Sequence, residues 1–127
     1  MTSYCTMCWL RILSNAGALA LYFIISNPLA HAAEVAYALR IENGHVPPNM
    51  QLIRVTQGDV VTLQWTADKP SIVHLHGYDI EKRVVPGAVT ELKFTARATG
   101  RFLVHLHGAA EAHGHEDVLV TVEVYPR

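Results

Sequence analysis

The same five-residue stretch, VHLHG, occurs twice in this 127-residue chain, at 73–77 and at 104–108. Each copy places two histidines two positions apart and follows them with a glycine. Residues i and i+2 of a β-strand project from the same face, so each copy would present two imidazoles side by side. Neutral imidazole is a common metal ligand in proteins. The repeat therefore indicates two paired-histidine arms that could hold a metal ion.

Six histidines form the predicted metal site. They are the four of the two VHLHG copies and two in the loop GAAEAHGHED: His74, His76, His105, His107, His113 and His115. Imidazole suits Cu(II), Zn(II) and Ni(II), and Cu(II) has the highest affinity for nitrogen sites, so copper is predicted first, with zinc as the alternative. The other interpretation is a polar rim without metal. His45 is interpreted as an ordinary surface residue in a loop.

The elements that must position these histidines are short strands separated by turn residues. No segment after residue 33 has a 3.6-residue hydrophobic period, and Glu81-Lys82-Arg83 is interpreted as a solvated charge run. The pattern predicts an all-β sandwich or barrel of about seven strands, rich in antiparallel pairs. The expected strands are 34–41, 50–56, 60–66, 71–76, 90–96, 101–107 and 118–124.

Each HLH unit stands at the end of its strand run, where glycine interrupts the pattern. We therefore expect the imidazoles near a rim, at one tip of the sandwich, with Leu75 and Leu106 facing the core. Gly77 would allow a close backbone approach or an unusual turn. For Tyr78 and Asp79 two roles stay open: Tyr78 covers the site and Asp79 holds an imidazole, or both serve the turn.

Residues 1–32 resemble a secretory signal peptide. Arg11 precedes an apolar run of 14 residues, Ile12 to Ile25, and the pattern Ala30-His31-Ala32 supplies the small residues of a cleavage site. We expect cleavage after Ala32, or one residue later; the alternative is an uncleaved membrane anchor. The predicted mature domain, 33–127, is then periplasmic or secreted and free of the membrane.

Cleavage would also remove both cysteines, because Cys5 and Cys8 lie in the leader. The mature protein would have neither a disulfide nor a thiolate ligand. Its 95 residues carry nine Lys or Arg against eleven Asp or Glu, a formal net charge of −2. This balance gives no reason to expect nucleic acid as a partner. Binding specificity must come from local groups such as the histidines.

The order of motifs resembles the cupredoxin family of small periplasmic domains. The motifs are GDVVTL, VHLHGYDI, VPG, LKFTARATGRF and LVTVEVYP, spread over about residues 35–125. The resemblance implies a Greek-key β-sandwich that holds copper at one end. By position it maps the family's early histidine ligand onto His74, with His76 as the alternative, and the late ligand cluster onto 105–115.

The ligand set departs from this family. Leu106 stands where the copper-binding cysteine is expected, and the late loop has no methionine. A blue-copper electron-transfer site needs the thiolate, so that site cannot form from the mature chain. The repeated H-x-H-G is instead similar to the histidine pairs of multicopper oxidases, larger relatives of this fold that use two domains. One domain without cysteine supports metal binding better than oxidase activity.

Three functions remain open at this stage. The first is a periplasmic copper carrier, buffer or delivery factor, whose partner is the metal ion and, with it, a periplasmic or membrane metal-handling protein. The second is a small copper or zinc enzyme with an open coordination position. The third is a metal-free interaction module. The sequence has more histidines than a catalytic site needs and no evident acid–base partner, so we favour the carrier over the enzyme.

Overall fold

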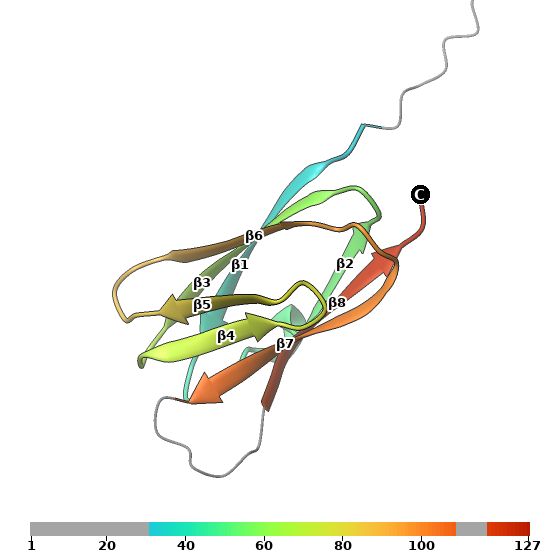
Figure 1. Cartoon of the computed structure of the whole chain (residues 1–127). Helices are drawn as coiled ribbons and strands as arrows, with labels where there is room; N and C mark the ends of the chain where they lie inside the picture. Colours follow the sequence, from blue (N-terminus) through green and yellow to red (C-terminus); the bar gives the residue numbers. More distant parts are fainter. Residues whose placement is uncertain (1–30, 109–116) are drawn as a thin grey trace, which may run out of the picture.

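The computed structural model describes residues 31–108 and 117–127, and these residues form two packed β-sheets (Figure 1). A three-stranded sheet has the order β1-β3-β6, and a five-stranded sheet has the order β2-β8-β7-β4-β5. The chain passes back and forth between the sheets. The predicted all-β, Greek-key sandwich is confirmed.

Eight strands are present in the described residues, where about seven were predicted. The only other regular element there is a short 3₁₀ turn at Pro48–Met50. The strands are β1 (Glu34–Ile41), β2 (Leu52–Thr56), β3 (Val60–Ala67), β4 (Ser71–Leu75), β5 (Ile80–Val84), β6 (Thr90–Thr95), β7 (Gly100–Gly108) and β8 (Asp117–Tyr125).

The additional strand is β5, which contains Glu81-Lys82-Arg83, the run interpreted from the sequence as solvated charges. These three residues are exposed, but they pair antiparallel with β4 along the edge of the five-stranded sheet. Charged side chains are common on edge strands, where they discourage pairing with other chains. The charge run is therefore part of an edge strand. Because its residues are exposed, the sequence lacks the alternation of apolar and polar residues that marks a half-buried strand.

The core lies between the sheets and follows the two-residue period of the strands. Along β3 every second residue is buried, and Trp65 is the largest fully buried side chain. In the five-stranded sheet the inward residues are mostly valine and leucine, which suit a pleated, buried surface. The completely buried ones are Val73, Leu75, Val84, Val104, Val120 and Val122.

Four of the six strand pairs in the described residues are antiparallel, as expected for an antiparallel-rich sandwich, and two are parallel. β1 runs parallel to β3, and β2 runs parallel to β8. Antiparallel pairs surround the histidine segments, since β7 lies between β8 and β4 and is antiparallel to both. The position of β4 beside β7 decides where the histidines meet.

Candidate metal centre

The histidines of both VHLHG copies lie on the outer face of the five-stranded sheet. In β4, Val73 and Leu75 are completely buried in the core, whereas His74 between them is only partly buried. In β7, Val104 is completely buried and Leu106 packs against the core. Because side chains alternate along a strand, His105 and His107 project from the opposite, outer face. Leu75 and Leu106 face the core, as predicted.

The register between β4 and β7 brings the two copies together. His74 is directly opposite His105, and Ile72 is opposite His107. The backbone N–H of His76 donates a hydrogen bond to the carbonyl of Leu103, at 2.9 Å, which continues this pairing past the end of β4. Residues directly opposite one another in a ladder share a face, so the four imidazoles occupy one patch of the sheet.

The imidazole rings in this patch lie close to one another. The ring centroids of His74 and His76 are 4.2 Å apart, those of His76 and His105 are 4.4 Å apart, and those of His74 and His107 are 5.5 Å apart. One nitrogen each from His74, His76 and His107 lies within 4.8 Å of the other two. Three nitrogens this close can be reached by a single metal ion, with His105 beside them.

The convergence of the two arms agrees with the sequence prediction, but the location differs from it. The tip of the sandwich was expected, whereas the histidines lie on the face of the sheet over β4 and β7. The reason is the antiparallel pairing: the whole of β4 pairs with the second half of β7, so the ends of the two strands point in opposite directions. His113 and His115, the remaining predicted ligands, lie outside the described residues.

Asp79 lies beside this histidine patch. Its carboxylate is 3.5 Å from Nε2 of His74, and its side chain is fully exposed. Asp79 also has a positive φ of 55°, in the left-handed region that aspartate tolerates better than most residues. Both roles left open for Asp79 therefore apply: it shapes the turn and faces an imidazole. A carboxylate in this position can orient a metal-binding imidazole.

Tyr78 takes the turn role and does not cover the histidines. Its ring packs 4.8 Å from that of Phe94 and 4.9 Å from that of Phe102, and its hydroxyl accepts a hydrogen bond from the backbone N–H of Arg97. Gly77 makes this reversal possible. Its φ is +86°, and a Cβ there would lie 2.7 Å from Cδ1 of Phe102. The glycine thus combines the unusual turn and the close approach predicted for it.

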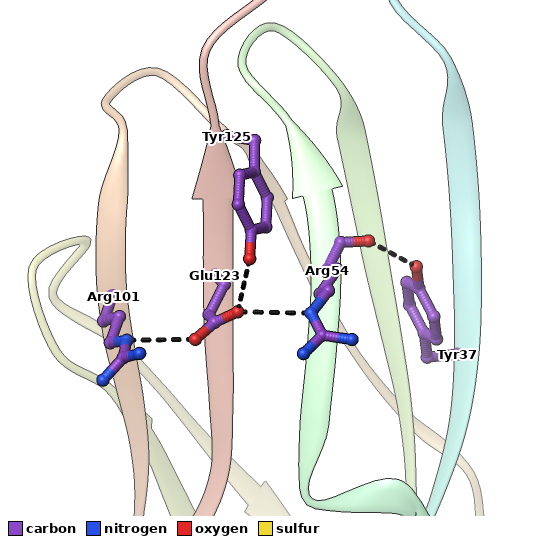
Figure 2. A network of polar contacts seen from close by, with 5 residues as sticks. All are labelled: Tyr37, Arg54, Arg101, Glu123 and Tyr125. Atoms are coloured by element: carbon purple, nitrogen blue, oxygen red, sulfur yellow. Dashed lines mark hydrogen bonds and ion pairs between the residues drawn. The ribbon is translucent and has the colours of Figure 1, made fainter.

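A second polar cluster lies at the other end of the same outer face (Figure 2). Glu123 of β8 contacts Arg54 of β2 at 3.3 Å and Arg101 of β7 at 3.0 Å, and it accepts a hydrogen bond from the hydroxyl of Tyr125 at 2.8 Å. The Tyr125 hydroxyl, together with the two guanidinium groups, lowers the pKa of Glu123. Sequence reasoning missed this cluster because its members are far apart in the chain.

Comparisons with known proteins identify the fold through structure alone. A scan of protein-family models finds no match for this chain, and a search of curated proteins finds no relative. Solved structures do match. The multicopper oxidase from Pseudomonas thermotolerans has a TM-score of 0.58 and 21% identity, over 76% of this chain and 31% of that chain. The fold is cupredoxin-like.

Two further structures match this cupredoxin-like domain. The blue copper oxidase from Nitrosomonas europaea has a TM-score of 0.57 and 21% identity, over 74% of this chain and 39% of that chain. The periplasmic domain of subunit II of cytochrome oxidase from Bradyrhizobium japonicum has a TM-score of 0.57 and 15% identity, over 76% of this chain and 87% of that chain. The chain thus spans less than half the length of the multicopper oxidase and of the blue copper oxidase.

The described residues were also compared with what a membrane-spanning helix requires. Within residues 31–108 and 117–127, no helix has the length and apolar character needed to cross a bilayer. The predicted leader lies almost wholly outside these residues, so the division into 1–32 and 33–127 stays a prediction.

Proposed function

We propose that this cupredoxin-like domain is an exported copper-binding protein that carries, buffers or delivers the metal. Its ligands are the imidazoles of His74, His76 and His107, with His105 beside them. The observation that carries the proposal is the approach of three nitrogens from two strands to within 4.8 Å of one another. His113 and His115, predicted from the sequence, remain candidates for completing the coordination.

The donor chemistry supports copper as the metal. The side chains that form the patch in the described residues offer imidazole nitrogens, and nitrogen sites of this kind bind Cu(II) more tightly than the other divalent first-row metals. Zinc is the alternative, since three histidines also form a known zinc site. The structural matches include a multicopper oxidase and a blue copper oxidase, which adds support for copper at this level of similarity.

The place of the patch supports carriage over catalysis. The histidines lie on the outer face of the sheet. Ring nitrogens of His76, His105 and His107 are buried there, while the side chain of His74 is 19% exposed, so a partner protein would approach the metal from the side of His74. A catalytic site ordinarily has a pocket that encloses substrate. Metal transfer between proteins requires an accessible site, because ligands of the donor and of the acceptor must contact the ion at the same time. The partner we propose is therefore another metal-handling protein of the same compartment.

The test is metal analysis and electron paramagnetic resonance of the exported protein loaded with one equivalent of Cu(II). We expect one bound copper with nitrogen hyperfine structure from imidazoles, and no intense sulfur-to-copper absorption band, because residues 33–127 contain no cysteine. The triple variant of His74, His76 and His107 to alanine should lose this signal, while the variant His45→Ala keeps it.

Other outcomes would redirect the proposal. Copper that stays bound to the triple variant would assign the metal to other groups. If the protein bound zinc more tightly than copper, zinc would be assigned as its metal. If the loaded protein turned over dioxygen or another substrate, the function would be that of a small metalloenzyme. If the protein bound neither metal, the remaining function would be that of a metal-free interaction module, whose stability and binding would not change when a chelator is added.

A further inference from the structure

Outside the histidine patch lies a buried carboxylate that the copper site does not use. Asp59, in the turn between β2 and β3, is only 6% exposed. Its Oδ2 accepts a hydrogen bond from the backbone N–H of Thr56 at 2.9 Å, and its Oδ1 accepts one from Nη2 of Arg127 at 2.8 Å. A further N–H reaches the same Oδ1, that of Ala33, at 3.1 Å.

Ala33 directly precedes the first strand and is hydrogen-bonded to the turn before β3. Its carbonyl accepts a hydrogen bond from the N–H of Val60 at 2.8 Å, and β1 begins at the next residue, Glu34. Residues 31–33 are exposed and precede the first strand. The bond between Ala32 and Ala33 is therefore accessible, and it is also the bond that the A-x-A pattern predicts to be cleaved.

We propose that the leader is removed after Ala32 and that Asp59 holds the new α-ammonium group of Ala33. Hydrolysis by an exporting cell's leader peptidase adds the hydroxyl of water to the carbonyl of Ala32 and a proton to the nitrogen of Ala33. That nitrogen changes from a neutral amide into an ammonium group at neutral pH. It does so 3.1 Å from a buried carboxylate oxygen, so processing would convert a hydrogen bond into an ion pair.

The geometry distinguishes between the two cleavage positions that the sequence leaves open. Cleavage after Ala32 retains both hydrogen bonds of Ala33 and adds a charge to one of them. Cleavage one residue later would remove Ala33. Asp59 would then keep its bonds to Thr56 and Arg127 but lose its third donor, and the N–H of Val60 would lose its acceptor. A buried group that loses its hydrogen-bond partner destabilises the fold, so the geometry favours cleavage after Ala32.

Other charged groups near Asp59 set the strength of this ion pair. Arg127 shares the same carboxylate oxygen, so its guanidinium competes with the ammonium. Arg97 lines the same surface depression as Ala32 and Arg127, and on β1 the carboxylate of Glu34 lies 3.9 Å from Lys93. The N–H of Thr56, followed by that of Ala33 and the charge of Arg127, lowers the pKa of Asp59, which keeps the carboxylate ionised at neutral pH.

The first test is the intact mass of the full chain after expression with its own leader and purification from the exported fraction. The expected mass is that of residues 33–127. A chain that begins at any other residue, or that keeps its leader, overturns the proposal.

The second test measures how fast the α-amino group of the exported protein is acylated at pH 7, by mass spectrometry of the N-terminal peptide. Only the neutral amine reacts, and an ordinary α-amino group has a pKa of about 7.7–8.0. A carboxylate partner that raises this pKa by one unit makes the reaction about tenfold slower. We therefore expect Asp59→Asn to accelerate acylation of Ala33 several-fold. The matched control is Asp68→Asn, because Asp68 also accepts a distant backbone N–H, that of Asn43 at 2.8 Å.

The variant Arg127→Gln distinguishes the loss of an ion pair from a general loosening of the fold. It also tests the proposal if Asp59→Asn does not fold. Without the competing guanidinium, the ammonium has Asp59 to itself, so acylation should become slower than in the wild type. A general loosening would make it faster. Equal rates in all variants, or faster acylation in Arg127→Gln, would overturn the proposal. Neither test depends on copper.

Discussion

The outer face of the five-stranded sheet carries two polar clusters of opposite character. At one end, Glu123 lies between Arg54 and Arg101, whose side chains are 64% and 76% exposed. At the other end, four imidazoles crowd together, and the side chain of His74 is only 19% exposed. Both clusters are built from residues on neighbouring strands.

The difference lies in how charge is balanced. In the Glu123 cluster, one anion meets two cations, so the protein supplies both signs itself. In the histidine cluster, groups of one kind are gathered, and neutral imidazoles present lone pairs that a shared cation can bind together. The comparison indicates that the first cluster joins strands at the surface, whereas the second has the composition of a metal site.

The largest expected effect is the loss of copper affinity on removing two ligands. The double variant His74→Ala/His107→Ala should weaken Cu(II) binding by at least about 100-fold, since loss of groups that merely orient ligands already costs about 10–100-fold. Isothermal titration against a competing chelator measures this. His45→Ala, an exposed loop variant, is the control. Equal copper affinity in the double variant and the control would mean that the histidine cluster, like the Glu123 cluster, does not bind the metal.

The second effect concerns the turn that places His76. Gly77→Ala should lower the free energy of unfolding in urea by about 2 kcal/mol or more, because alanine pays for a left-handed conformation and meets the ring of Phe102. Gly87→Ala is the matched control, since Gly87 has a φ of +82° and no atom within 4 Å of an added Cβ. If both variants lose the same stability, the Phe102 contact contributes nothing.

A smaller effect is expected for the carboxylate of Asp79, which lies beside His74. Asp79→Asn keeps the turn geometry, because asparagine also tolerates a positive φ, and it removes the negative charge. Copper affinity should fall by up to about tenfold, at the low end for a group that orients a ligand, because Asp79 is fully exposed. Competition titration measures the change, with Asp68→Asn as the control. An unchanged affinity would mean that Asp79 serves the turn alone.

The smallest effect is expected in the Glu123 cluster. Glu123→Gln should leave copper affinity unchanged and reduce stability slightly, since ion pairs to arginines as exposed as Arg54 and Arg101 contribute little. The Tyr125 hydroxyl, followed by Arg54 and Arg101, lowers the pKa of Glu123 below 4.5. Its contribution is therefore full above pH 4.5 and is lost as the pH falls through the folded-state pKa. Thermal unfolding of both proteins between pH 3 and 7 measures this; a gap that widens in acid would contradict the assignment.

Most of the strand pattern was predictable because it depends on local alternation. The expected strands near 34–41, 60–66 and 118–124 match β1, β3 and β8 closely, since each buries alternate residues. β5 was missed because an exposed edge strand shows no such alternation. The Glu123 cluster was unpredictable for another reason: Arg54 and Glu123 are 69 positions apart, and their contact depends on the pairing of β2 with β8.

The sequence by itself determined the chemistry of this protein's candidate site: paired imidazoles that share a strand face, and no thiolate after residue 32. The tertiary structure decided where the imidazoles meet. His74 stands opposite His105 because Val73, Leu75 and Val104 must all face the core, and a register slip of one residue would turn the histidines inward. Local spacing sets the direction of a side chain, but burial of the core sets which distant strand lies beside it.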